Sequence, residues 1–452
     1  MASKGDAARE TAVRILYEVR DGGAYANVAL AQALRRTALT DQDRRFLTEL
    51  VYGAVKAGDT LDWILRRYTT RPVKKLQPMI RAILRLGIYQ LFYLDRVPAS
   101  AVCNTSVELA KKMGLRSLAG LVNGVLRTAV REPEWAAFPT GKGHATEGLA
   151  LASQHPEWLV RRWVRAFGFS AAEHLCAFDN EEPPLSVRTN TLRTNREELL
   201  QRLRAAGAEA AASVWAPEGV IITRHGALDS LAPLAEGLCQ VQDESSMLVA
   251  HVAAPRRGTV VIDCCAAPGG KTTHLAALMG DTGRIIACDI YEHKLARIRE
   301  NADRLGIRSI EAKLLDAREI GARYTEAADC VLVDAPCSGL GVLRRKPDAR
   351  WRKTAAEIAA LPALQLAILE SAARAVKRGG TLVYSTCTIE LAENQEVVSA
   401  FLSAHPEFSL DTTGTYLPEG AGKAAHGDAK MVQLMPHIDG TDGFFIARMK
   451  KG

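Results

Sequence analysis

The chain has 452 residues, of which 48% are hydrophobic and 24% charged, so two or three globular domains are expected. No apolar run approaches the ~20 residues that cross a bilayer, and MASKGDAARE lacks an apolar signal region, which predicts a cytoplasmic location and no membrane partner. Residues 1–140 hold 22 Lys and Arg against 13 Asp and Glu, within a net charge of +7, so this part is expected to meet a polyanion unless its cations only solvate helix faces.

Residues 5–132 show helical periodicity throughout. An apolar stripe with i, i+3, i+4, i+7 spacing begins at Ala12, and Asp21-Gly22-Gly23 ends that helix. Further stripes follow, and one helix opens at Pro78. Because no strand-period segment interrupts them, we predict an all-α bundle over residues 1–135.

Two shorter parts follow the bundle. The apolar pattern lapses and proline and glycine cluster, which predicts a linker over residues 136–148. Beyond it we expect a helix near 157–167, a strand in LSVRTNTL, a helix from Arg196 and a strand near Gly219. We interpret residues 149–235 as a small α/β module.

The last part, residues 236–452, alternates apolar strands with helices. TVVIDCC, GRIIACDI, CVLVDAP and GGTLVYSTC are typical of buried parallel strands, with helices near 271–280, 292–305, 355–377 and 390–404. This order predicts a doubly wound, Rossmann-like α/β sheet. Its ligand is then expected beyond the carboxyl ends of the strands.

A glycine turn follows the first of these strands. Ala267-Pro268-Gly269-Gly270 precedes a helix that opens at Lys271, so backbone N–H groups can approach a ligand carboxylate closely. Asp289 ends the next strand, where it could bind both ribose hydroxyls, and Asp316 could reach an adenine amino group. The dinucleotide pattern G-x-G-x-x-G is absent, and a P-loop would need glycine at Cys265, so an adenosyl ligand without phosphates fits best.

Two cysteines stand at strand ends of the same sheet. Cys337 follows Asp334 in DAPCSG, and Cys387 lies in YSTCT. A single cysteine there is usually inert packing, but two beside an adenosyl site suggest covalent chemistry. The nine cysteines are odd in number and contain no CxxC pair, so neither a disulfide framework nor a metal site is expected.

Methylation of cytosine at C5 would use both thiols. A thiolate that adds to C6 makes C5 nucleophilic, and a carboxylic acid at N3 relieves the developing charge. Asp334 is placed for that support, and a second cysteine could assist release of the product. Chemistry alone does not order the two cysteines.

The motifs DCCAAPGGKT, DAPCSG and YSTCT resemble the NOP2/Sun family of RNA cytosine-C5 methyltransferases, and the resemblance spans about 185–452, with SVRTNTLR and GTDGFFIARM. It implies that Cys387 is the nucleophile, that Cys337 assists release and that S-adenosylmethionine is the methyl donor. The implied cofactor contacts are Cys265, Ala266, Ala267, Pro268, Gly269, Gly270, Lys271, Asp289, Asp316 and Asp334.

The N-terminal helices resemble the RNA-binding factor NusB in ARETAVRILYEV and ILRLGIYQLFYLDRVP. A NusB-like bundle joined to a NOP2/Sun catalytic part is the arrangement of members that modify small-subunit (16S) rRNA, which implies an unpaired hairpin-loop cytosine as the target, no DNA partner and a monomer. A tRNA-directed member of the family is the close alternative. A non-catalytic assembly or antitermination factor is the alternative from another class, and the presence of every expected catalytic residue argues against it.

Overall fold

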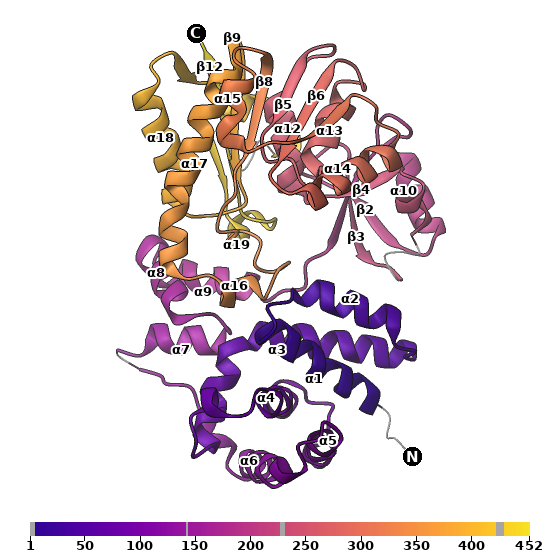
Figure 1. Ribbon diagram of the computed structural model, residues 1–452, viewed down its shortest axis with the longest axis vertical. Coiled ribbons are helices and arrows are strands. Elements are labelled where there is room, and N and C mark those ends of the chain that lie inside the picture. Colours follow the sequence, from indigo (N-terminus) through magenta and orange to yellow (C-terminus); the bar gives the residue numbers. More distant parts are fainter. Residues whose placement is uncertain (1–4, 142, 227–230, 422–428) are drawn as a thin grey trace. The chain divides into compact units, whose positions relative to one another are not determined.

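The computed structural model describes residues 5–141, 143–226, 231–421 and 429–452. The chain forms two compact units (Figure 1). Unit 1 comprises residues up to Asn180 together with Lys346–Arg352, and unit 2 comprises Glu181–Arg345 and Lys353–Gly452. A short stretch of the later sequence therefore completes the first unit.

Unit 1 is helical, as the periodicity predicts. Its helices are α1 (Asp6–Arg20), α2 (Ala26–Arg36), α3 (Asp41–Tyr68), α4 (Pro78–Tyr93), α5 (Ala99–Lys112), α6 (Ala119–Arg131), α7 (Ala145–Ala152), α8 (Glu157–Phe167), α9 (Phe169–Phe178) and the short α16 (Ala349–Arg352). The Thr40 hydroxyl accepts from the backbone N–H of Asp43 and caps α3, while Pro78 opens α4. Helix α7 begins inside the stretch that we expected to be a linker, and α9 was not predicted.

Unit 2 begins with a small antiparallel sheet in the order β2-β3-β1-β4. Its elements are β1 (Leu185–Thr189), α10 (Arg196–Ala205), β2 (Glu209–Ala212), β3 (Gly219–Arg224), α11 (Ala232–Ala235) and β4 (Cys239–Val241). Val187, Leu199, Leu203, Val220 and Ile222 are buried between the sheet and α10. The strands expected near residues 185 and 219 and the helix expected from Arg196 are thus present, with β2 and β4 in addition, whereas α8, which we expected in the same module, belongs to unit 1.

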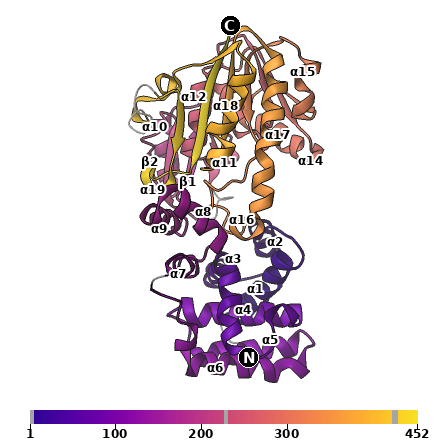
Figure 2. The same cartoon turned by 90° about the vertical axis from the view of Figure 1, so that its left-hand side faces the viewer.

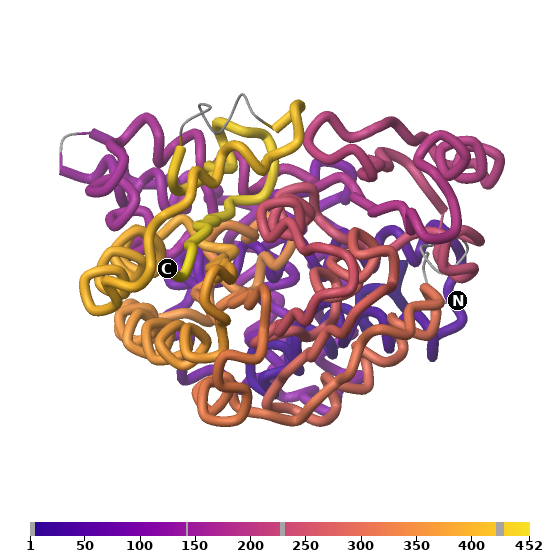
Figure 3. Tube along the Cα trace, turned by 90° about the horizontal axis from the view of Figure 1, so that it is seen from above, coloured from indigo at the N-terminus to yellow at the C-terminus, as the bar shows by residue number. Residues whose placement is uncertain are grey.

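The large sheet has the order β10-β12-β9-β8-β5-β6-β7, with β11 paired to β12. Its strands are β5 (Val260–Asp263), β6 (Arg284–Asp289), β7 (Ile310–Leu314), β8 (Ala328–Asp334), β9 (Val376–Thr386), β10 (Phe408–Leu410), β11 (Met431–Leu434) and β12 (Phe444–Lys451). The five strands from β9 to β7 are parallel; they include the four predicted strands and β7 in addition. Strands β10, β11 and β12 are antiparallel, and β12 runs beside β9 near the C terminus (Figure 3).

Helices cover both faces of this sheet. They are α12 (Glu244–Ala253), α13 (Gly270–Leu278), α14 (Glu292–Leu305), α15 (Ile320–Arg323), α17 (Ala355–Ala375), α18 (Gln395–Ala404) and the short α19 (Pro436–Asp439). In β5, Ile262 packs in the core layer that contains α17 and α18. The preceding residue, Val261, points to the other face of the sheet and packs in the core layer that contains α12 and α13. Helix α17 is long and apolar enough to cross a membrane by length and composition, but it packs against α15, α18, β8 and β9 (Figure 2).

Candidate active site

The carboxyl ends of the parallel strands carry the polar residues that the sequence indicates. Asp263 ends β5, Asp289 ends β6 and Asp334 ends β8. Cys387 follows β9 directly. Because these strands are parallel neighbours, their ends meet at one edge of the sheet, which is where a doubly wound fold binds its ligand.

The two cysteines lie together. The sulfur atoms of Cys337 and Cys387 are 3.4 Å apart, and both residues are only partly buried. The hydrogen bond with Cys387, together with burial, raises the pKa of the Cys337 thiol well above its ordinary value. Cys337 is therefore a neutral thiol near pH 7, which can donate a proton to its neighbour.

An ion pair borders the cysteines. The Lys271 ammonium lies 2.7 Å from one oxygen of Asp334, and the Ser385 hydroxyl donates to the other at 2.8 Å. Burial would lower the pKa of Lys271, but the charge of Asp334 and its hydrogen bond outweigh this and raise the pKa above its ordinary value. Lys271 also interacts electrostatically with Cys387, so a cation, a carboxylate and two thiols share one site.

The turn after β5 has the shape that a small ligand needs. Gly269 has φ +98° at the start of α13, a conformation that favours glycine, and the Gly269 N–H donates to Ala266 at 2.7 Å. Asp263 is buried, and its Oδ2 accepts from the Thr272 hydroxyl at 2.7 Å. Its Oδ1 accepts no hydrogen bond of normal geometry from the described residues, so the site offers a buried acceptor to a ligand amino group.

The two remaining acidic residues, Asp289 and Asp316, differ in how much acceptor capacity they have left for the cofactor. Asp289 accepts from the backbone N–H of Tyr291 at 3.1 Å and has acceptor capacity left for ribose hydroxyls. Asp316 is bound by the guanidinium of Arg318, the shortest contact being 2.6 Å, and these hydrogen bonds lower the pKa of Asp316. To bind adenine, Asp316 would share its carboxylate with Arg318. Exposed apolar side chains at Ile290 and Leu314, which the sequence reasoning missed, flank these two carboxylates along the chain.

Arg188, on strand β1 of the small sheet, supports the glycine turn that precedes α13. This side chain is fully buried, and its guanidinium donates to the Gly270 carbonyl at 2.6 Å and to the Thr273 hydroxyl at 2.9 Å. Burial lowers the pKa of Arg188 to about 9. The motif SVRTNTLR therefore braces the first turn of α13, a role that sequence spacing did not reveal.

A carboxylate–imidazole cluster includes His274 of α13. His251 Nε2 is 3.0 Å from Glu218, and His274 Nε2 is 2.8 Å from the same oxygen. Burial would raise the pKa of Glu218, but its contacts with the two imidazoles outweigh this and lower it, while burial lowers the pKa of His274 to about 4. Glu218 also interacts with the charge of Arg188, so the cluster balances the buried guanidinium.

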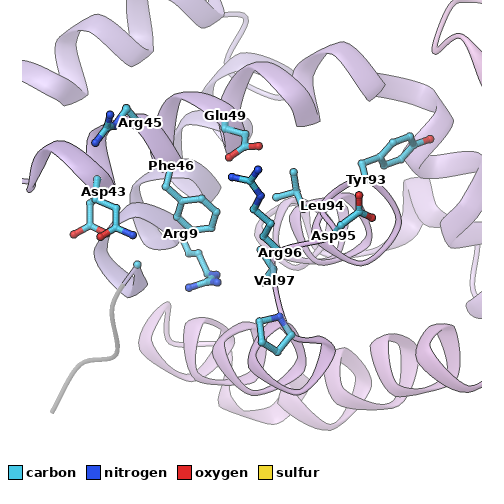
Figure 4. A pocket seen from close by; sticks show the side chains of 13 residues that line it. Arg9, Asp43, Arg45, Phe46, Glu49, Tyr93, Leu94, Asp95, Arg96 and Val97 are labelled. Atoms are coloured by element: carbon cyan, nitrogen blue, oxygen red, sulfur yellow. The ribbon is translucent and has the colours of Figure 1, made fainter. Parts of the chain in front are cut away.

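Unit 1 contains a hollow of about 880 Å³. Figure 4 shows Arg9 beside Phe46 and Arg96 extending toward Glu49. Three arginines and three carboxylates line it, so their charges cancel. The excess positive charge of the N-terminal region must therefore lie elsewhere on this unit.

Three family models match successive parts of the chain. The 16S rRNA methyltransferase RsmB/F model matches residues 250–450. The NusB family model matches residues 6–131, and the ferredoxin-like domain of RsmF/B-like methyltransferases matches residues 155–229. The predicted NusB-like bundle and methyltransferase part are confirmed.

Individual relatives agree with the family models. A probable ribosomal RNA small subunit methyltransferase B of Bacillus subtilis is 40% identical over 452 residues, which is 99% of each chain. The crystal structure of PH0851 has a TM-score of 0.84 at 27% identity and full coverage of both chains. That of NSun6 from Pyrococcus horikoshii with SFG has a TM-score of 0.59 at 26% identity, covering 66% of this chain and 98% of the other. The chain therefore belongs to the RsmB/F family of 16S rRNA methyltransferases, whose methyl donor is S-adenosylmethionine.

Proposed function

We propose that this methyltransferase acts on C5 of a cytosine in small-subunit rRNA, through a covalent bond between Cys387 and C6. The observation that carries the proposal is the pair of thiols 3.4 Å apart, next to the Lys271–Asp334 ion pair. A single strand-end cysteine could be packing, but two partly exposed thiols beside a cation and a carboxylate are suited to nucleophilic catalysis.

The residues divide the work as follows. Cys387 adds to C6 as a thiolate, while Asp334, in its carboxylic acid form, gives its proton to N3 as negative charge moves into the ring. Lys271 keeps Asp334 in place and favours negative charge on Cys387. The C5 proton then leaves to water, N3 returns its proton to Asp334, and cleavage of the C6–sulfur bond restores the aromatic ring. The neutral Cys337 thiol, whose sulfur lies 3.4 Å away, can donate a hydrogen bond to the departing Cys387 thiolate.

The cofactor contacts support the same proposal. Bound S-adenosylmethionine supplies an electrophilic methyl group. The turn from Cys265 to Lys271 and the buried Oδ1 of Asp263 would hold the amino-acid end of that molecule, and Asp289 would hold its ribose. Asp334 contacts Lys271 at the end of this turn and interacts electrostatically with Cys337, which suits transfer at the strand ends.

The two cysteines should fail in different ways when replaced. Cys387→Ala is expected to abolish methylation of a 16S rRNA transcript while leaving S-adenosylmethionine binding unchanged. Cys337→Ala is expected to trap the enzyme on RNA as a complex that survives denaturant. Cys176→Ala, which removes a buried thiol of unit 1, is the control and should methylate normally. Full activity of the Cys387→Ala variant would refute the assignment of the nucleophile.

The RNA target is proposed from the relatives and from charge. We expect an unpaired hairpin-loop cytosine, because such a base enters a pocket at little unstacking cost. The excess positive charge of residues 1–140 suits phosphate contacts. We further propose a cytoplasmic monomer. Methylation of tRNA transcripts in preference to 16S rRNA would overturn this choice of substrate.

A further inference from the structure

We infer that Glu393 and Gln365 are positioning residues. They hold the loop that carries Cys337 (residues 336–338) and the loop that carries Cys387 (residues 386–388) close to each other. This inference rests on the proposed roles of the two cysteines. Glu393 belongs to the short turn before α18, and Gln365 belongs to α17. Both side chains have no exposed surface. Neither belongs to a cysteine loop, yet both contact one or both of these loops.

Glu393 contacts the loop that carries Cys337. One oxygen of its carboxylate accepts from the backbone N–H of Ser338 at 2.8 Å and from the Gln365 amide at 2.9 Å. The same amide nitrogen donates to the Pro336 carbonyl at 3.0 Å. The residues on either side of Cys337 are therefore both fixed through this pair of buried side chains.

The second loop is tied to the same group. The Ser338 and Thr388 hydroxyls are 2.7 Å apart, and Thr388 is 3.5 Å from the other Glu393 oxygen. Asn394 accepts from the Thr386 hydroxyl at 2.6 Å and donates to the Thr388 carbonyl at 3.0 Å. Residues 386 and 388, which flank Cys387, are thus held by the residue next to Glu393.

The charge of Glu393 adds a second effect. Its partners in the described part of the chain are neutral N–H and O–H groups, so the carboxylate acts on its surroundings as an uncompensated charge. It raises the pKa of Cys337 further, after the hydrogen bond with Cys387 and burial. Glu393 and Gln365 together, here called the clamp, therefore set the distance between the two thiols, and the charge of Glu393 favours the protonated form of Cys337.

The rate of oxidative cross-linking tests whether the two thiols are held close together. Diamide takes two electrons and two protons from a pair of thiols, leaving one disulfide and the hydrazine. We expect the full-length protein to form the Cys337–Cys387 disulfide readily, and Glu393→Ala and Gln365→Ala to form it at least tenfold more slowly when the rates are compared at equal thiolate fractions of Cys337. Peptide mass spectrometry identifies the cross-link. Ser371→Ala is the matched control, because Ser371 is also buried on α17 but binds Gly321, away from both loops.

Activity and ionisation complete the test. Glu393→Ala should lower kcat for rRNA methylation at least tenfold with the Kd for S-adenosylmethionine within twofold of the parent. Glu393→Gln keeps an acceptor for Ser338, so it should restore most of the cross-linking rate, while the pH at which Cys337 is alkylated falls because the charge is gone. If the alanine variants cross-link as fast as the parent, the clamp is refuted. If the cross-linking rate depends on Glu393 and Gln365 but the parent does not methylate rRNA, the clamp stands and the proposed function fails.

Discussion

At the scale of single residues, Asp263 shows how the fold prepares a site before any ligand binds. Burial raises the pKa of Asp263 to about 7, even though the Thr272 hydroxyl acts in the opposite direction. Its carboxylate is also close enough to Asp334 for the two charges to repel. A group with this pKa is half-protonated near neutral pH, so the cofactor turn is sensitive to pH.

Asp263→Asn should remove that sensitivity. Because the pKa of Asp263 is higher in the folded chain than the ordinary value of 3.8, the folded state keeps a proton that the unfolded chain loses, and stability falls as pH rises from about 4 to above 7. From pH 4.5 to pH 8 the parent should lose roughly 2–4 kcal/mol more than the variant. Urea unfolding of both proteins without cofactor, at several pH values, measures the difference. Parallel pH profiles would contradict it.

Residue identities at strand ends could be predicted, but their partners could not. The motifs indicate Asp289, Asp334, Cys337 and Cys387, because acidic and thiol groups follow apolar strands. The contacts that orient them come from distant parts of the chain, as with Ser385 and Asp334. Such groups meet only because of the register between neighbouring strands, and the hydrophobic pattern of the sequence does not predict that register.

At the scale of elements, the parallel strands β5, β6, β8 and β9 were predictable because each contains a continuous apolar run that is largely buried, whereas the edge strand β7, IEAKL, is partly exposed. The antiparallel strands were harder. Strand β10 has three residues, and β2 has three alanines with little apolar surface to mark it. Strand β12 ends in Arg448, Met449, Lys450 and Lys451, and these cations obscure its apolar pattern. Arg448 is nevertheless buried, because its guanidinium donates to the carbonyls of Val252 and Ala253.

One surface element of unit 1 suits RNA. From residue 63 to residue 94 the sequence has no Asp or Glu. Within this stretch, the basic segment that runs from the last turn of α3 to Lys75 exposes Arg66, Arg67, Arg71, Lys74 and Lys75. Arg67 also lies over the ring of Trp63, 4.2 Å from its centroid. Exposed cations without nearby acids in sequence are the pattern that phosphate contacts require.

Reversing charge in the basic segment should weaken RNA binding. We expect Lys74→Glu with Lys75→Glu to raise the Kd for a 16S rRNA hairpin at least fivefold at 0.1 M salt and to reduce the salt slope of log K by about two. Lys111→Glu with Lys112→Glu changes the charge equally, but these lysines already pair with Glu108 and Glu10, so binding should change less. Filter binding at several salt concentrations distinguishes the two pairs. Equal weakening by both would show that only net charge matters.

At the scale of the whole molecule, the order of the sequence and the order of the units differ. Lys346–Arg352 follows the Cys337 loop in sequence but belongs to unit 1. Arg350 there is fully buried and donates to the Asp179 carbonyl at 3.0 Å and to Asn180 at 2.9 Å. The boundaries 1–135, 136–148, 149–235 and 236–452 remain a prediction. No local pattern could have indicated that a segment more than 150 residues later completes the helical unit.

The contact between Gly58 and Trp351 offers the test of this arrangement. Trp351 donates from its indole nitrogen to the Lys56 carbonyl at 2.9 Å, and a Cβ on Gly58 would lie 2.2 Å from the ring. Gly58 also has φ +45°, which disfavours alanine. Gly58→Ala should therefore destabilise unit 1 by roughly 2–5 kcal/mol, from strain and from overpacking together.

Trp351→Ala separates these two causes. Removing the indole costs about 2–4 kcal/mol by itself, but it also opens the space that the new Cβ would fill. The double variant should then be more stable than the sum of the two single effects predicts, by about 1–3 kcal/mol, because only the backbone strain at Gly58 remains. Urea unfolding followed by a probe of unit 1 measures the cycle. Additivity would mean that residues 346–352 do not pack against α3 in solution, since a contact that is absent cannot couple the two substitutions.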